Sequence, residues 1–600
     1  MSLVPSSRLF LGVRQSFSGR LWRDRLDGPM TMQALAIAQR LGVPDLLARI
    51  LAGRGVTVED ADAFLDPSLR RHMPDPDRLT DMEAAAELLA AAVMKRRRIA
   101  IFGDYDVDGA TSAALLADWL QATGLTAAIH IPDRIFEGYG PNIEAIGRLR
   151  REGAELLVTV DCGTTSLEVL GEARRLGLDV LVIDHHQAGE ALPAVNALVN
   201  PNRLDDLSGQ GHLAACGVTF LVLVAASRLL RRRGWWTAAR PEPDLMASLD
   251  LVALGTVADV VPLKGLNRAY VGRGLAVMRQ RRRLGLRALM DVARLDGPPT
   301  PYHLGFLIGP RINAGGRIGD AALGARLLLT TDESEATEIA ATLDKLNRER
   351  QTIESGMLDE ALAEAQAALG AEERGAAIVT ASERWHPGVA GLVAARLKER
   401  YGRPAFAIAF GEDGTGTGSG RSIAGVDLGK AVRTAVEGLI LVKGGGHAMA
   451  AGITIERASL GAFRQFLEET LASAVTAARA NAGLDIDGAL SASAATLALV
   501  ESLEQAGPFG QGNPEPVFAL PAHTVAFADA AGGSHLRLRL KGADGGVLDA
   551  IAFRALGQPL GESLMAHRGK PVHVVGTLSV DRWGGREKLQ LRVIDAAGVA

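Results

Sequence analysis

Residues 99–120, IAIFGDYDVDGATSAALLADWL, contain the pattern that decides the fold. The stretch starts with four mostly apolar residues, which are typical of a buried strand, and ends with the apolar spacing of a helix. Between the two, aspartates occupy every second position, at Asp104, Asp106 and Asp108. The pattern predicts a strand–loop–helix unit with acidic residues at the carboxyl end of the strand, where open α/β sheets bind their ligands.

The three aspartates can converge on one point, because alternate residues of an extended segment project to the same side. Since burying unpaired carboxylates is costly, a hard divalent cation is expected among them. Two alternatives are a solvated acidic turn and a calcium loop of the EF-hand type. The calcium loop requires a glutamate six residues after Gly109, and Leu115 occupies that place.

Two further strand ends carry the same kind of residue. The apolar segment 155–160 is followed by Asp161, and the segment 178–183 is followed by the sequence Asp184-His185-His186. The alternation of strands and helices predicts a parallel, doubly wound sheet, in which these junctions lie side by side. Asp259 follows an apolar helix; taken alone, such a residue is more often a helix cap than a ligand.

Composition limits the class of protein. A chain of 600 residues predicts several domains, and a net charge of −4 gives no overall nucleic-acid signature, so any such binding must use local basic patches. Two cysteines, Cys162 and Cys216, exclude a disulfide framework and suit a reducing compartment. Because the chain contains neither the apolar run of a membrane span nor a signal-peptide core, we expect a soluble, cytoplasmic protein without membrane contacts.

The pattern of predicted elements divides the chain into five segments. These are an N-terminal arm over 1–45 with a poorly ordered start over about 1–30, an α/β domain over 46–332, a long connecting helix over 333–370, a second α/β domain over 371–484, and an all-β barrel of the OB-fold class over 485–600. Glycine-rich segments at 411–420 and 443–446 are expected to be loops that could cradle phosphate.

The barrel contains the segment HLRLRLKG, which places His535, Arg537 and Arg539 on one face of a strand and leucines on the other. The alternation alone is that of any half-buried strand. The basic face favours nucleic-acid binding.

The motifs GDYDVDG, VDCG and DHH, in this order, resemble those of the DHH phosphoesterase superfamily. The later motifs GPRINAGGRIGD, WHPGVAGLVAARL, SGRS and KGGGHAMAAG are similar to those of the bacterial RecJ family of single-strand-specific 5′-to-3′ DNA exonucleases. The resemblance extends over roughly residues 80–530. It implies a DHH catalytic domain followed by a DHH-associated domain.

The resemblance further implies two metal ions, Mn²⁺ or Mg²⁺. One ion is held by Asp106 and Asp161 with Asp104 nearby, and the other by Asp108, Asp161, His185 and Asp259. The resemblance also implies that His186 contacts the scissile phosphate. A donor set dominated by oxygen suits these ions better than zinc, and two such ions can activate water and stabilise an in-line displacement.

A cleft between the two α/β domains is also implied by the resemblance. Its expected substrate-binding residues are Arg134, Arg311, Asn313 and Arg317 from the first domain and His386, Ser419, Arg421, Ser422 and His447 from the second. Arg317, Ser419 and Arg421 form the implied clamp for the 5′-phosphate, since arginine forks suit a terminal phosphate. A surface salt bridge is the alternative for each arginine.

The implied activity is metal-dependent hydrolysis of single-stranded DNA from its 5′ end to release 5′-mononucleotides, in DNA repair and recombination. We expect a monomer, with single-strand-binding protein and a DNA helicase as candidate partners. One alternative is a hydrolase of short RNA oligonucleotides or cyclic dinucleotides, but the additional N-terminal region and barrel favour a polymeric substrate. Another is a non-catalytic replication scaffold, which the retained ligands argue against.

Overall fold

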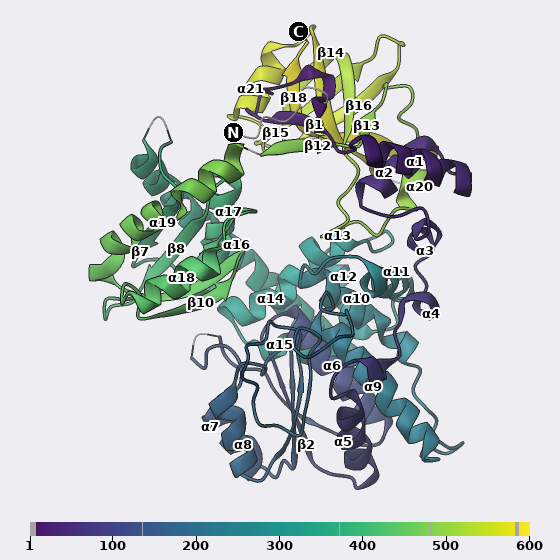
Figure 1. The fold of residues 1–600 in the computed structure, drawn as a ribbon, viewed down its shortest axis with the longest axis vertical. Helices are drawn as coiled ribbons and strands as arrows, with labels where there is room; N and C mark the ends of the chain where they lie inside the picture. Colours follow the sequence, from purple (N-terminus) through teal and green to yellow (C-terminus); the bar gives the residue numbers. More distant parts are fainter. Residues whose placement is uncertain (1–7, 135, 371–372, 481, 582–586, 600) are drawn as a thin grey trace.

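The computed structural model describes residues 8–134, 136–370, 373–480, 482–581 and 587–599. Three bodies surround a central opening in the ribbon, with the first α/β domain below, the second to the left and the barrel above (Figure 1). Both ends of the described chain lie at the barrel. None of the helices within these residues is long and apolar enough to cross a bilayer.

The first α/β domain contains the predicted parallel, doubly wound sheet. Its strands are ordered β3-β2-β4-β5-β6, with bounds β2 (Ile99–Gly103), β3 (Ala128–His130), β4 (Leu156–Val160), β5 (Asp179–Ile183) and β6 (Ala197–Val199). The chain leaves β2 to one side for β3 and returns on the other side for β4. Because of this reversal, the topological switch point of the sheet lies between the carboxyl ends of β2 and β4. Sheets of this kind bind their ligands at that point.

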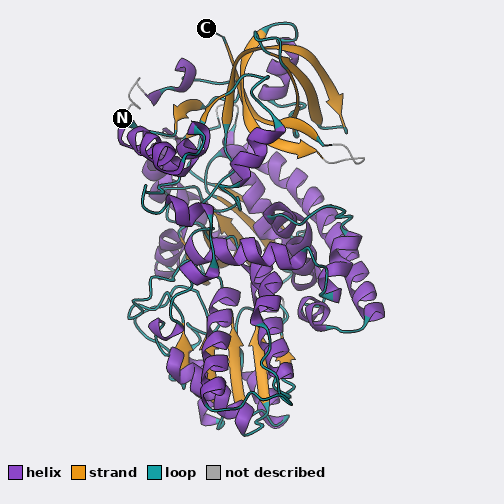
Figure 2. Ribbon diagram, turned by 90° about the vertical axis from the view of Figure 1, so that its right-hand side faces the viewer, coloured by secondary structure: helices purple, strands orange, loops and turns teal. Residues whose placement is uncertain are grey.

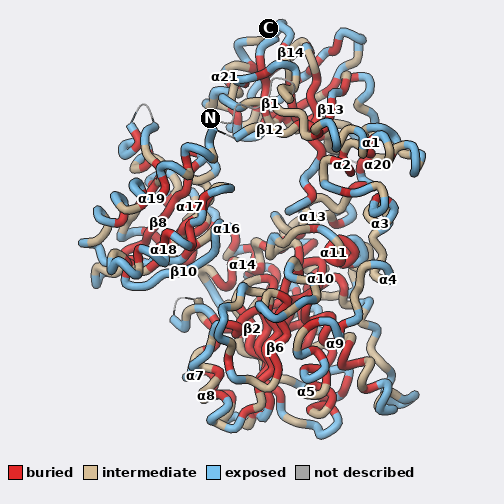
Figure 3. The backbone as a smooth tube through the Cα atoms, viewed as in Figure 1, coloured by how far each residue is buried: buried red, intermediate tan, exposed pale blue. Residues whose placement is uncertain are grey.

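Helices cover both faces of this sheet. Alternate β2 residues, Ile99 and Ile101, pack with one set of helices: α5 (Met82–Met94), α6 (Val107–Ala122) and α9 (Ala215–Arg232). Ala100 and Phe102 pack on the other face with α7 (Ile143–Arg151) and α8 (Leu167–Arg175). Figure 3 shows buried residues along the sheet and the adjoining helices. Because helices cover both faces of the sheet, a ligand can reach it only at the ends of its strands.

A helical layer follows the sheet in sequence. It comprises α10 (Leu249–Ala258), α11 (Gly265–Met278), α12 (Leu284–Val292), α13 (Pro301–His303), a π-helical turn (Leu304–Ile308), α14 (Gly309–Ile318) and α15 (Ala322–Leu329). The segment 301–318 is one continuous helical run. Helix α16 (Glu333–Leu369), capped by Asp332, occupies the place of the predicted connecting helix.

The second α/β domain has a mixed sheet ordered β10-β11-β9-β8-β7. Its strands are β7 (Ile378–Ser382), β8 (Ala405–Phe410), β9 (Thr415–Arg421), β10 (Lys443–His447) and β11 (Ala450–Glu456), and its helices are α17 (Pro387–Tyr401), α18 (Leu428–Glu437) and α19 (Leu460–Ala480). Helix α17 packs against both β8 and β9.

The expectation that the glycine-rich segments are loops is wrong, because they form most of β9 and β10. A Cβ atom on Gly416 would lie 2.7 Å from the ring of Phe410, and one on Gly420 would lie 2.4 Å from that of Phe406. The glycines therefore serve close packing within the sheet, which requires the same residue type as a phosphate loop.

The C-terminal barrel is confirmed. Its strand order is β13-β14-β15-β16-β18-β17, and pairing of β14 with β17 closes it. The bounds are β13 (Gly488–Ala489), β14 (Phe518–Ala531), β15 (His535–Lys541), β16 (Val547–Ala552), β17 (Pro571–Asp581) and β18 (Lys588–Gly598), with helices α20 (Leu497–Glu504) and α21 (Pro559–Ala566). Figure 2 shows these strands curving above the flatter catalytic sheet.

The expectation of a poorly ordered start is wrong for residues 8–30, while residues 1–7 lie outside the described chain. Strand β1 (Leu21–Asp24) pairs in parallel with β12 (Gly483–Ile486) beside the barrel. Trp22 is fully buried there, and its indole N–H donates to Asp595. The pairing partner is too distant in sequence for local pattern to reveal it.

The following helices also belong with the barrel. Helices α1 (Gly28–Leu41) and α2 (Asp45–Gly53) share a hydrophobic core with Leu490, Leu503 and Phe518. Short helices α3 (Ala61–Leu65) and α4 (Leu69–His72) then lead down to the catalytic domain.

Candidate active site

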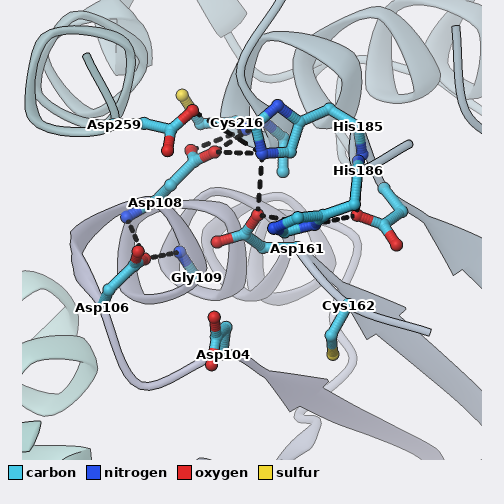
Figure 4. Close-up of polar contacts among 12 residues, drawn as sticks. Asp104, Asp106, Asp108, Gly109, Asp161, Cys162, His185, His186, Cys216 and Asp259 are labelled. Atoms are coloured by element: carbon cyan, nitrogen blue, oxygen red, sulfur yellow. Dashed lines mark hydrogen bonds and ion pairs between the residues drawn. The ribbon is translucent and has the colours of Figure 1, made fainter. Parts of the chain in front are cut away.

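The predicted strand-end residues converge at the switch point of the catalytic sheet (Figure 4). Asp104 directly follows β2, Asp161 follows β4, and His185 and His186 come two and three residues after the end of β5. Asp259 arrives from a different direction, at the C-terminus of α10. Carboxylates and imidazoles from four elements therefore surround one volume.

The first turn of α6 fixes two further carboxylates. Asp106 caps the helix, and its Oδ1 accepts hydrogen bonds from the backbone N–H groups of Asp108 (2.9 Å) and Gly109 (3.1 Å). Asp108 is buried and accepts from the N–H groups of Ala215 (2.6 Å) and Cys216 (2.9 Å) at the start of α9. Two helix N-termini thus hold these anions, as their dipoles favour.

Asp161 occupies the middle of the cluster. It is buried and adopts a left-handed backbone conformation, with φ of 61°. Its Oδ1 lies 3.3 Å from Nε2 of His185, and Oδ2 of Asp259 lies 3.6 Å from the same nitrogen. His185 Nδ1 donates to the Leu213 carbonyl oxygen at 3.0 Å, which orients the ring so that Nε2 points at these two carboxylates.

Three buried polar atoms at this point have no hydrogen-bond partner among the described residues: Asp161 Oδ1, Asp259 Oδ2 and His185 Nε2. Such atoms are costly unless a cation occupies the space between them. Three groups among the described residues have donor atoms close enough to share an ion: Asp104, Asp106 and Asp161; Asp108, His185 and Asp259; and Asp161, His185 and His186. The donors, mostly carboxylate oxygens with imidazole nitrogens, fit Mn²⁺ or Mg²⁺.

The electrostatics of the carboxylates support this interpretation. Burial, and then repulsion from neighbouring carboxylates, raises the pKa of Asp104, Asp161 and Asp259 well above the usual range. Burial similarly raises the pKa of Asp108. The fold therefore concentrates negative charge that divalent cations would neutralise.

Asp184 is a site residue that the sequence analysis did not assign. It is buried, accepts a hydrogen bond from His186 Nδ1 at 2.7 Å, and also accepts from the N–H groups of His185 and Thr164. Burial alone would lower the pKa of His186, but the bond to Asp184 raises it to about 9. The DHH motif contains Asp184, but sequence alone does not indicate that it supports His186 rather than the cluster.

Guanidinium groups gather beside the carboxylates. Arg134, Asn313 and Arg317 line a cavity of about 270 Å³ together with Asp104, Asp106 and Asp259. Burial, followed by repulsion from Arg134 and other arginines, lowers the pKa of Arg317 to about 10. Burial and then Arg134 likewise lower the pKa of Arg421, which lies on β9 of the second domain. Arginines from both domains therefore form a cationic site.

The start of α17 completes this cationic side. Ser419 and Arg421 lie against its first turns, since a Cβ on Gly391 would be 3.0 Å from the Arg421 guanidinium and 3.5 Å from the Ser419 hydroxyl. The His386 ring caps α17 by accepting from the Gly388 N–H, and Arg317 donates to the Gly388 carbonyl at 3.0 Å.

His447, at the end of β10, faces the first domain. Burial and then the charges of His186, Arg433 and His185 lower its pKa. His447 of the second domain therefore lies near enough to His185 and His186 of the first for their charges to act on it.

The structure places two predicted residues in other roles. Arg311 is ion-paired with Asp344 of α16 at 2.9 Å and donates to the Leu307 carbonyl oxygen, so it joins two helices. Ser422 is 1% exposed and donates to the Val426 carbonyl oxygen at 2.7 Å, which turns it away from the cleft. Of the two roles considered for each arginine, phosphate binding and a salt bridge, Arg311 has the salt bridge in this structure.

Arg537 and Arg539 lie away from the cluster, exposed on β15 of the barrel. Arg539 pairs with Asp549 at 3.1 Å, and Arg537 lies over the ring of Phe527 at 5.8 Å. The basic face predicted from HLRLRLKG is therefore present, with one of its charges partly compensated.

Comparison with known proteins assigns the chain to a family. The DHH family N-terminal domain matches residues 98–256, the DHHA1 domain matches 374–473, and the RecJ OB domain matches 486–595. A "Single-stranded-DNA-specific exonuclease RecJ" from Dickeya dadantii is 38% identical over 560 residues, covering 92% of this chain and 96% of the relative. The chain belongs to the RecJ family.

Two RecJ crystal structures from Thermus thermophilus agree with this assignment. The structure in complex with Mn²⁺ has a TM-score of 0.77 at 33% identity, covering 96% of this chain and 79% of that one. The structure with Mg²⁺ has a TM-score of 0.72 at 31% identity, covering 96% and 78%. The resemblance inferred from the motifs is confirmed, and both structures hold a metal of the expected class.

Proposed function

We propose that this chain is a metal-dependent exonuclease that removes 5′-mononucleotides from the 5′ end of single-stranded DNA. The observation that carries the proposal is the contact between two sites of opposite character: a carboxylate–imidazole cluster with orphaned buried atoms, and an arginine cluster at its edge. The RecJ relatives supply the substrate class by their names.

Two Mn²⁺ or Mg²⁺ ions are the proposed cofactors. Asp106 and Asp161, with Asp104 nearby, would hold one ion, and Asp108, Asp161, His185 and Asp259 would hold the other. When bound, such a pair of ions supplies an activated water nucleophile and stabilises the charge of an in-line phosphoryl displacement.

The chain's own residues perform the remaining tasks. The backbone N–H groups at the starts of α6 and α9 fix Asp106 and Asp108, so the donor atoms need no rearrangement. His186, protonated through its bond to Asp184, would donate a hydrogen bond to a non-bridging oxygen of the scissile phosphate. A side-chain nucleophile is unnecessary for this chemistry.

The arginine cluster is the proposed receptor for the 5′-terminal phosphate. Arg317, Ser419 and Arg421 would clamp it, with Arg134 and Asn313 beside the metal centre and His386 and His447 completing the cleft. Crowded, partly desolvated guanidinium groups are satisfied by a multiply charged anion, and a terminal phosphate has more charge than an internal one. This would select a strand end.

The barrel is the proposed grip for the rest of the strand, through Arg537 and Arg539. We further propose single-strand-binding protein and a DNA helicase as partners, a monomeric state, a cytoplasmic location and a role in DNA repair and recombination.

The test compares substrates in the presence of Mn²⁺. A linear single strand with a 5′-phosphate should be shortened from its 5′ end with release of mononucleotides, while a circular single strand and a blunt duplex should resist, and a chelator should abolish the reaction. Cleavage of the circle, or a preference for dinucleotides over long strands, would contradict the proposal.

A further inference from the structure

We propose that Asn267 is a positioning residue for the metal ion assigned to Asp108, His185 and Asp259. Its side-chain amide joins the two segments of the chain that set the positions of these three donors. This inference rests on the proposed function, because it concerns one ion of the proposed two-ion centre. Asn267 is not one of the donor residues, so it would act through them.

The three donors of this ion come from three separate parts of the chain. Asp108 lies in the first turn of α6, His185 follows β5, and Asp259 lies at the C-terminus of α10. In Figure 4 they lie together on one side of the cluster, beside Cys216. They can share an ion only while the three elements keep their relative positions, so groups that join the elements also determine the affinity of the site.

One segment, residues 212–216, fixes two of the donors. Its backbone accepts the hydrogen bond from His185 Nδ1 and donates two hydrogen bonds to the Asp108 carboxylate. The carbonyl oxygen of His212, the first residue of this segment, accepts a hydrogen bond from the Asn267 side-chain amide at 2.7 Å. Asn267 therefore holds the segment that orients both donors.

A second segment leads away from the third donor. After Asp259 the chain turns sharply at Val260, which has a left-handed φ of 61° and is 63% exposed. Two residues later, the Pro262 carbonyl oxygen accepts a hydrogen bond from the same Asn267 amide at 3.0 Å. The amide nitrogen has two N–H groups and uses one on each segment, which fixes His212 relative to Pro262.

The surroundings of Asn267 make this bridge sensitive to substitution. The side chain is fully buried near the start of α11, and its Oδ1 has no hydrogen-bond partner among the described residues. A buried acceptor without a partner is costly, and an apolar side chain would avoid that cost. The same apolar side chain would remove the bridge. The two donated hydrogen bonds therefore account for a polar residue at this position.

The test replaces Asn267 by alanine and measures Mn²⁺ binding directly. The full chain is titrated with Mn²⁺, and the free ion is followed by its electron paramagnetic resonance signal. Wild type should bind two ions. In Asn267→Ala one ion should bind as in wild type and the other about ten- to a hundredfold more weakly, as is typical when a group that supports metal ligands is removed. Asn267→Asp, which keeps the shape but lacks the N–H donors, should show the same loss.

Asn196→Ala is the matched control for general destabilisation. Asn196 also joins two segments of the catalytic domain, because its side chain donates to Asp179 at 3.0 Å and accepts from the Val180 N–H at 2.7 Å. These contacts lie at the amino end of β5, whereas His185 follows its carboxyl end. The control should lower the thermal unfolding temperature and keep both Mn²⁺ affinities.

Kinetics add a readout that a loss of stability alone would not change. The Mn²⁺ concentration for half-maximal nuclease activity should rise about ten- to a hundredfold in Asn267→Ala. Saturating Mn²⁺ should restore kcat, because every donor is still present, and KM for DNA should match that of wild type. An unchanged Mn²⁺ requirement would contradict the assignment.

Hydrogen exchange of the wild-type chain tests the bridge without a substitution. Mg²⁺ should slow the exchange of backbone N–H groups at 262–267 as well as at 212–216, because the bridge joins both segments to the donors. Slower exchange at the donor residues with no change at 262–267 would count against the bridge.

The outcomes separate this inference from the proposed function. If wild type binds two Mn²⁺ ions and degrades single strands, but Asn267→Ala binds both ions as wild type does, the assignment is wrong and the proposed function stands. An equal loss of Mn²⁺ affinity in Asn196→Ala would also overturn the assignment. If wild type binds no Mn²⁺, the proposed function is overturned and the assignment falls with it.

Discussion

The carboxylate cluster and the arginine cluster are built in opposite ways. The carboxylate cluster belongs to one domain, and backbone N–H groups of that same domain fix Asp106 and Asp108. The arginine cluster draws Arg134 and Arg317 from the first domain and Arg421 from the second. Metal binding should therefore depend on one folded domain, whereas phosphate recognition should depend on the contact between two.

The largest expected effect comes from Asp161→Ala, because this carboxylate is shared by both proposed ions. Activity should fall by orders of magnitude and bound Mn²⁺ should be lost. The metal-free variant should keep its fold, since the loss of one of several mutually repelling buried carboxylates offsets the cost of placing alanine in the left-handed backbone conformation of Asp161. Nuclease rate, metal content and thermal unfolding with and without Mn²⁺ would be measured.

Asp296→Ala, at an exposed carboxylate, is the control for this change. Wild type and control should both gain thermal stability when Mn²⁺ is added, because an ion that binds only the folded state stabilises it by mass action. A near-normal rate in Asp161→Ala would remove the bridging role.

Arg421→Ala should weaken recognition of the 5′-phosphate by the arginine cluster. A charge-assisted contact contributes about 1.5–3 kcal/mol, so cleavage of 5′-phosphorylated strands should fall about ten- to a hundredfold. Strands with a 5′-hydroxyl should lose much less, and the Mn²⁺-dependent gain in thermal stability should match that of wild type. Equal losses on both substrates would instead indicate general backbone binding.

Asp184→Asn tests the support of His186. The carboxylate that holds the imidazole is replaced by an amide of the same shape, and losses of about tenfold or more in kcat are typical when such a supporting group is removed. Metal content should remain, because Asp184 belongs to none of the three groups of side chains that could hold an ion. Loss of Mn²⁺ together with kcat would show that Asp184 supports the metal centre instead.

The smallest effect is expected on the barrel. Arg537→Ala/Arg539→Ala should raise KM for long strands and reduce the salt dependence of binding by about one to two units. Arg539 should contribute less than Arg537, because Asp549 already compensates part of its charge. A titration of DNA affinity against salt concentration with each single variant checks this order. Unchanged salt slopes would show that this face of β15 does not bind DNA.

Sequence predicted those parts of the molecule in which neighbouring residues determine the structure. The aspartates after β2 and β4 follow from strand ends, and the barrel follows from alternation and turns. The partners of Arg311 and Ser422, Asp344 and the Val426 carbonyl oxygen, could not be predicted because they depend on tertiary packing. The expectation that residues 411–420 form a loop was wrong because close packing in a sheet and phosphate binding in a loop both require glycine.

The pairing of β1 with β12 affects how the protein folds during its synthesis. Arg23 and its partner Asp485 are 462 positions apart, so a ribosome adding about 5–20 residues per second needs roughly half a minute to a minute and a half between them. Throughout that interval, Trp22 and the apolar faces of α1 and α2 await the barrel that will bury them. The segment that contains β1, α1 and α2 therefore lacks its packing partners until the barrel has been synthesised, and it is exposed to aggregation and proteolysis throughout that interval.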